Sequence, residues 1–223
     1  MKKPDNADAL VGGPDAGTNK DVGSGKLAEA HGPAGAAGAA ENLYEQGAGL
    51  IMPHVFLHGV ARAPLTEADR ASMEQGILCL DLWLKDHPNS WQTLWVLGKA
   101  HQRLGRAERA GEFFWRSHEE NPRHPDVARE LVMEFIALGR SVEAVHFART
   151  AVEVDPGDVA LQVNLALALL ISGQIDEALL HASQALSRDP ADAVTANVVS
   201  FIRDVAEERQ PVPSRLSKYP GPS

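Results

Sequence analysis

The chain has 223 residues, of which 44% are hydrophobic and 5% aromatic, so a sizeable core can form but must be packed mainly with Leu, Val and Ala. The formal net charge is −9 and no cluster of Lys or Arg appears, which argues against nucleic acid and anionic membrane as main partners. The single cysteine, Cys79, excludes an internal disulfide and is expected to be a small core residue in a reducing compartment.

The N-terminal segment, 1–48, is rich in Gly, Ala, Asp and Asn and has almost no periodic apolar residues. Such a segment cannot bury enough surface to offset its ordering entropy, so we expect a disordered arm. It begins Met1-Lys2-Lys3, but no apolar run follows, and no signal peptide is predicted. Later apolar runs fall short of the ~18 residues that a membrane span needs, so a cytoplasmic location is expected.

The next segment, 49–90, combines an apolar patch at 50–60 with a predicted helix at 67–86. Thr66 is the expected N-cap, and acidic residues follow in the first turn, where the helix dipole favours them. Pro88 ends the helix. No helix that would pair with it is recognisable in the sequence, so this segment is expected to be a capping half-repeat.

Prolines, glycines and alanines then recur at a fixed spacing of 34 residues. A period of this length is typical of stacked helical hairpins. The glycines allow the positive φ of a tight turn between two helices, and the prolines end the second helix. The recurring residues are Pro88, Pro122, Pro156 and Pro190; Gly105, Gly139 and Gly173; and Ala110, Ala144 and Ala178.

This period divides the rest of the chain into three units, a last helix and a tail. Each unit is predicted to contain a helix, a turn at its glycine, a second helix and a stop at its proline. The last helix is expected to cap the stack, because it becomes polar towards its end, and the proline-rich tail is expected to be flexible. The predicted ranges are 91–124, 125–158 and 159–192 for the units, 193–209 for the capping helix and 210–223 for the tail.

Small and apolar residues occupy corresponding positions in the three units. They include Leu97, Gly98, Ala110 and Phe114 in the first, Leu131, Val132, Ala144 and Ala148 in the second, and Leu165, Ala166, Ala178 and Ala182 in the third. This spacing resembles that of tetratricopeptide repeats (TPR), although Leu94, Ala128 and Gln162 replace the family's leading Trp. The resemblance implies an all-α, right-handed superhelical solenoid of antiparallel helical hairpins. The Arg-over-Lys and Ala/Gly-rich composition suits a bacterial genome.

In this family the first helix of each hairpin lines the concave face, so the resemblance implies a partner-binding groove there. Asn164 and Asn197 are of interest because an amide can both donate to and accept from the backbone of an extended peptide. The alternative is that they are solvated polar positions. The residues expected to face the groove are Gln92, Trp95, Lys99, Gln102, Arg129, Met133, Ile136, Asn164, Leu167, Asn197 and Phe201.

The Lys/Asn/Arg clamp by which chaperone adaptors of this family hold a terminal carboxylate is absent from the corresponding positions. The groove is mixed and rather apolar, which suits an amphipathic helix or a hydrophobic segment. The first helix of the third unit is apolar nearly all round and should be buried nearly all round. Either a partner covers its concave side, or the apolar patch at 50–60 folds back into the groove.

No catalytic, cofactor-binding or metal-binding arrangement is predicted. His54 and His58 lie four residues apart, but no third ligand accompanies them, and packing or chance is favoured. His118 and His124 flank the turn at Pro122 and are expected to be solvated loop residues. No phosphate-cradling loop, nucleophile elbow or zinc framework occurs.

The sequence therefore predicts a non-enzymatic scaffold or adaptor that binds a peptide, helix or apolar segment of a partner protein in its concave groove. One alternative is a chaperone for apolar export substrates, similar in architecture to those of type III secretion, and another is a regulatory subunit of an enzyme complex. A homodimer through the half-repeat at 67–86 is also expected, because the outer face of that helix lacks a partner.

Overall fold

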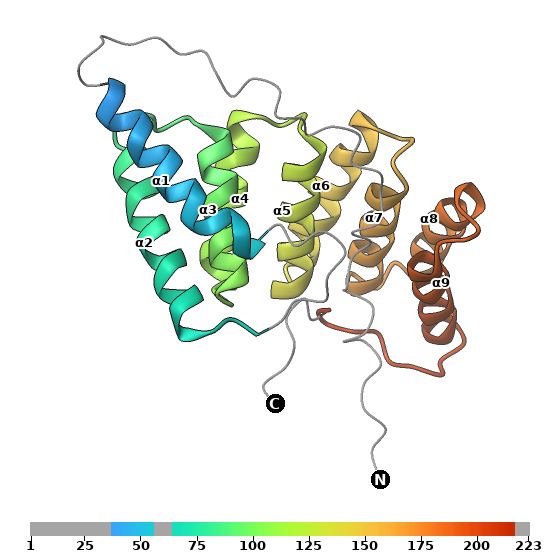
Figure 1. Cartoon of the computed structure of the whole chain (residues 1–223). Coiled ribbons are helices and arrows are strands. Elements are labelled where there is room, and N and C mark those ends of the chain that lie inside the picture. The colour runs from blue at the N-terminus through green and yellow to red at the C-terminus, as the bar shows by residue number, and fades with distance from the viewer. Residues whose placement is uncertain (1–36, 56–63, 217–223) are drawn as a thin grey trace.

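The computed structural model describes residues 37–55 and 64–216. Over these ranges the chain forms nine α-helices and no strand, and the helices stack into one elongated array (Figure 1). No helix within the same ranges combines the length and the apolar character of a membrane span. The helices are α1 (Ala37–Val55), α2 (Glu67–Trp83), α3 (Trp91–Arg103), α4 (Ala107–Glu120), α5 (Pro125–Leu138), α6 (Ser141–Val154), α7 (Val159–Ile171), α8 (Ile175–Arg188) and α9 (Ala193–Ala206).

Consecutive helices pair into four hairpins, α1–α2, α3–α4, α5–α6 and α7–α8, and α9 packs against α8 and α7 at the end of the stack. Successive hairpins are joined by contacts of α4 with α5 and of α6 with α7. The chain is thus an all-α helical-repeat protein, and the predicted fold class is confirmed.

Caps and glycine turns set the helix boundaries. The Asp158 carboxylate accepts from the Leu161 N–H at 3.0 Å and begins α7, while Thr66 and Asp69 form a capping box at the start of α2. The first helices of the three predicted units end at glycines with φ between 71° and 80°, a conformation that L residues rarely adopt. The predicted glycine turns at Gly105, Gly139 and Gly173 are confirmed.

The first hairpin corrects the prediction for the N-terminal segment. α1 begins at Ala37, so the expected disorder over 37–48 is wrong, and the helix at 67–86 does have a partner. The two helices approach closely at Gly47 and Gly76, because a Cβ on Gly76 would lie 2.8 Å from the Gly47 carbonyl oxygen. The segment 1–36 lies outside the described residues.

The core consists of two main clusters. One joins α1, α2 and α3 and includes Ile51 and Leu80, both fully buried. The larger one runs through α4 to α9 and also includes Leu216, which follows α9 in the tail. Every residue of α7 from Leu161 to Ile171 is buried, as predicted for a helix that is apolar nearly all round.

Two further predictions concern single residues. Cys79 is a buried free thiol, which confirms its expected place in the core. The tail was expected to be flexible, but the Leu216 side chain is fully buried in the larger cluster, so that expectation is wrong at this residue.

Candidate functional site

The first helices of the three predicted units and the capping helix form the face on which the groove was predicted. We call the surface of α3, α5, α7 and α9 the inner face. Its helices are held together by contacts of α7 with α5 and α9, and by polar side-chain contacts between α3 and α5.

The predicted groove residues divide by their position along the helices. In the first two turns, Gln92 and Trp95 are half-buried, Arg129 is about one-third exposed and Asn197 is exposed. Asn164, also near the start of its helix, is only 7% exposed. Further along the helices the predicted residues are all buried, with 7% exposure or less. These are Lys99, Gln102, Met133, Ile136, Leu167 and Phe201.

A cluster of hydrogen-bonded polar side chains lies on the inner face between α3 and α5. The Lys99 ammonium donates to Glu130 at 2.8 Å, and the Gln102 amide donates to Glu130 at 2.8 Å and to Glu134 at 3.1 Å. Glu134 is fully buried. The cost of burying these charged and polar groups is offset by the hydrogen bonds between them. Lys99 and Gln102 therefore contribute to the packing of α3 against α5.

Glu134 was missed as a residue of this face. The signal in the sequence was a matching spacing, because Glu130 and Glu134 are four residues apart on α5 and Lys99 and Gln102 are three apart on α3. Both spacings place the two side chains on one side of a helix.

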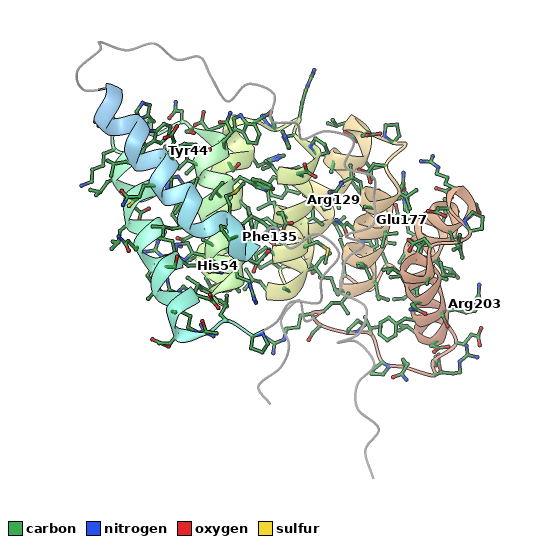
Figure 2. All side chains as sticks on the ribbon, viewed as in Figure 1. Tyr44, His54, Arg129, Phe135, Glu177 and Arg203 are labelled. Carbon is green, nitrogen blue, oxygen red and sulfur yellow. The ribbon has the colours of Figure 1, made fainter. Side chains whose placement is uncertain are left out.

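Arg129 links α5 to α7. Its guanidinium donates to Asp126 at 2.7 Å and to Asp158 at 3.0 Å, and it projects from α5 towards the start of α7 (Figure 2). Asp158 is also the N-cap of α7, so the Arg129 charge and the helix cap share one carboxylate.

Asn164 is a buried polar residue of the inner face. No described residue accepts a hydrogen bond from its Nδ2, although that atom is buried. A buried amide without a partner destabilises a protein by about 1–3 kcal/mol. An acceptor placed beside Nδ2 would remove this penalty, and Arg129 Nε on the same face is likewise buried without an acceptor among the described residues.

The histidines behave as packing residues. His54 Nδ1 lies 3.7 Å from an Asp69 carboxylate oxygen, while His58 is outside the described residues. His118 is 7% exposed and packs edge-on against Phe147, so its expected place in a solvated loop is wrong. Burial is the main cause that lowers the pKa of His118. No group of three or more His, Cys, Asp or Glu residues in 37–55 and 64–216 is arranged to hold a metal ion.

The apolar patch at 50–60 does not fill the inner face over its described part. The Ser72 hydroxyl donates to the Leu50 carbonyl at 3.3 Å, and Ile51 and Val55 join the cluster of α2 and α3. Residues 56–60 lie outside the described ranges. A different segment reaches the inner face, because the Leu216 N–H donates to the Ile136 carbonyl at 3.4 Å.

No protein-family model matches this chain, and no curated protein matches it. Several solved structures do resemble this chain. MamA from Desulfovibrio magneticus RS-1 superposes with a TM-score of 0.57 at 20% identity over 63% of this chain and 79% of MamA. YrrB, described as a TPR protein with an unusual peptide-binding site, gives 0.55 at 17% identity over 64% of this chain and 74% of YrrB. The first TPR domain of human RPAP3 gives 0.50 at 15% identity over 55% of this chain and 96% of the domain.

Helical hairpins stacked through small residues define the chain as an α-helical repeat protein. Its fold is the tetratricopeptide-repeat fold, as the 34-residue period predicted.

Proposed function

We propose that the chain is a non-enzymatic scaffold or adaptor that holds a segment of a partner protein on its inner face. The observation that carries this proposal is Asn164, whose buried Nδ2 has no acceptor among the described residues. The fold supports it, because stacked helical hairpins offer an extended surface to another chain. The structural likeness to YrrB, which has a peptide-binding site, is consistent with it.

In this proposal an extended peptide lies across the inner-face helices. A peptide carbonyl accepts from Asn164 Nδ2, and the exposed amide of Asn197 offers a further donor and acceptor. Trp95 is half-buried and supplies a flat apolar surface of the kind that anchors interfaces.

The remaining expectations follow from the sequence. The net charge of −9 makes proteins, rather than nucleic acid or anionic membrane, the expected partners. A cytoplasmic location, a bacterial source and the absence of cofactors and metals remain predictions of the same kind. The flexible arm and tail remain predictions for 1–36 and 217–223.

The homodimer was expected because the helix at 67–86 had no recognisable partner, but α1 pairs with α2. α2 still exposes Leu78 by 64% and Leu82 by 47%, four residues apart on one side of the helix. We retain a homodimer through this side as a proposal. Light scattering of the full chain tests it, and a strict monomer at high concentration would refute it.

The alternatives gain no support from the inner face. A chaperone for apolar export substrates would need an apolar concave surface, but Leu167 is only 2% exposed. A regulatory subunit of an enzyme complex would use the same inner face as a scaffold and differs only in the identity of the partner.

A peptide library displayed on phage and selected against the full chain tests the proposed function. We expect enrichment of linear peptides whose affinity falls about 3- to 10-fold in Asn164→Ala, the loss expected for one hydrogen bond. Gln184→Ala, an exposed position on α8, is the matched control and should leave affinity unchanged. Failure to enrich any linear peptide, or equal affinities for the two variants, would refute the proposal.

A further inference from the structure

The chain reverses direction immediately after α9. The N–H groups of Arg209 and Gln210 both donate to the Asp204 carbonyl, at 2.8 and 3.1 Å, and Glu208 has a positive φ of 59°. The Arg209 guanidinium also bonds the Asp204 carboxylate at 2.6 Å, which ties the turn together. This turn sends the following residues back along the stack.

Residues 210–216, which we call the C-terminal strap, run from α9 past the end of α7 to α5 (Figure 1). Pro211 and Pro213 favour an extended backbone and have no N–H to donate. Val212 is 48% exposed, whereas Leu216 is fully buried. The strap is thus an extended segment with one apolar anchor.

The anchor belongs to the core cluster that also contains several residues predicted to bind a partner. Leu216 belongs to the same buried cluster as Met133, Ile136 and Leu167, and its N–H donates to the Ile136 carbonyl at 3.4 Å. That carbonyl is in the last turn of α5 and also accepts from the Gly139 N–H at 3.2 Å, so the strap shares it with the C-cap of the helix.

The strap also approaches the backbone at the end of α5. A Cβ on Gly139 would lie 3.0 Å from the Ser214 carbonyl oxygen, so the glycine of the turn leaves space for the strap as well as providing the positive φ.

We propose that the C-terminal strap is an internal ligand of the inner face. Leu216 fills an apolar site beside Ile136, and a partner segment enters by displacing it. This inference rests on the proposed function, because it specifies the chemistry of the partner segment and how the binding of that segment is regulated. The partner is an extended segment with an aliphatic side chain that takes the place of Leu216, and its own N–H takes over the Ile136 carbonyl.

Tethering makes the internal ligand effective even if its contacts are few. A segment joined by a short linker acts at an effective concentration on the order of a millimolar. The strap follows α9 closely in the chain, so a free peptide must compete with a strap that is present at this effective concentration. Strong partners would bind, and weak, non-specific segments would be excluded.

Fluorescence anisotropy with a labelled synthetic peptide of residues 210–223 tests the proposal on full-length chains. We expect Leu216→Asp to bind this peptide at least about tenfold more tightly than the wild-type chain does, because its own strap no longer competes. Val212→Asp adds the same charge at an exposed strap position and should behave as wild type. Equal binding by folded Leu216→Asp and wild-type chains would overturn the proposal.

Hydrogen exchange on the wild-type chain decides the question if Leu216→Asp fails to fold. The Leu216 amide should exchange at least about tenfold more slowly than the amide of exposed Ser214, and equal rates would overturn the proposal. Neither measurement uses an external partner. If the strap is bound but the library yields no peptide, the proposed function alone is refuted. If the library yields peptides but the strap is not bound, the role of the strap alone is refuted.

Discussion

Gly98 shows how little room the hairpins leave at single positions. A Cβ on this residue would lie 2.5 Å from Cε1 of Phe114, whose ring is fully buried. Real Cβ atoms do not approach a ring so closely, and a buried ring cannot move without displacing its neighbours. The identity of this residue is therefore set by packing between α3 and α4 and not by a turn.

Gly98→Ala should lower the free energy of unfolding by about 1–3 kcal/mol, the usual effect of overpacking a core. Gly49→Ala is the matched control, since a Cβ there meets nothing within 4 Å and the helix propensity of Ala should add up to about 1 kcal/mol. Urea unfolding followed by circular dichroism measures both. A destabilising Gly49→Ala, or a neutral Gly98→Ala, would contradict this account.

The burial of His101 makes the free energy of unfolding depend on pH. Burial, with smaller effects from Arg106 and Arg109, lowers its pKa from 6.5 to about 4, and the ring stacks on Phe113 at 5.2 Å between centroids. The unfolded chain, with the ordinary pKa, takes up the proton first as the pH falls. Protonation therefore favours the unfolded state between pH 6.5 and about 4.

The wild-type chain should lose stability over this range relative to His101→Phe, which removes the titrating group. We expect the difference in the free energy of unfolding to change by about 2 kcal/mol between pH 7 and pH 4, after allowing for solvent screening. Urea titrations at several pH values measure it. Parallel pH profiles for the two proteins would contradict the assignment.

At the scale of elements, α1 completes a hairpin that has an unusually long connection. In this hairpin Gly47 and Gly76 are 29 positions apart, whereas Gly98 and Ala110 in the next one are 12 positions apart. In the α1–α2 hairpin two glycines let the backbones approach each other, whereas in the α3–α4 hairpin Gly98 makes room for the Phe114 ring.

Gly76→Ala should release α1, because the new Cβ would lie 2.8 Å from the Gly47 carbonyl oxygen and 2.8 Å from Cγ1 of Ile51. We expect the amides of α1 to exchange at least about tenfold faster, while those of α7 and α8 are unaffected, since repeat proteins are coupled mainly through neighbours. Hydrogen exchange with mass spectrometry measures both regions. A uniform change along the chain would argue against local release.

The same hairpin shows what the sequence could and could not reveal about elements. The predicted units at 125–158 and 159–192 begin at the first residues of α5 and α7, because the period fixes their register. α1 was missed because its long connection breaks the period and because the glycines and Pro53 in it lower helix propensity. Packing against α2 and α3 overrides that propensity.

At the scale of the whole molecule, the C-terminal strap joins the end of the stack to its middle. Leu216 bonds to Ile136 on α5, whereas the contacts of α9 itself are with α7 and α8. A stack in which each unit contacts only its neighbours frays from its ends. The strap adds a contact that bypasses a hairpin and so restrains the last helix.

Leu216→Ala should therefore raise the exchange of the α9 amides, by about threefold or more, with little change in α3 and α4. Val212→Ala, at an exposed strap position, is the control. If α9 keeps its protection in Leu216→Ala, the strap does not restrain it.

The candidate site was less predictable than the fold. The repeat register placed Met133 and Leu167 on the inner-face helices, but it carries no information on how closely adjacent helices approach, and both side chains are buried. The strap was missed because it has no periodicity, and Leu216 is one of few apolar residues in a proline-rich tail. Long-range contacts of this kind leave no local pattern in a sequence.

The attachment of Leu216 to α5 also determines how the molecule would respond to mechanical force. Tension applied through the C-terminal end would be transmitted at Leu216 to the last turn of α5 before it could reach α9, since the anchor comes later in the chain than α9 does. Rupture of this anchor would release the slack in the strap, and only then would the load pass to the terminal helix. Stretching would therefore expose the site beside Ile136 before any helix unravels.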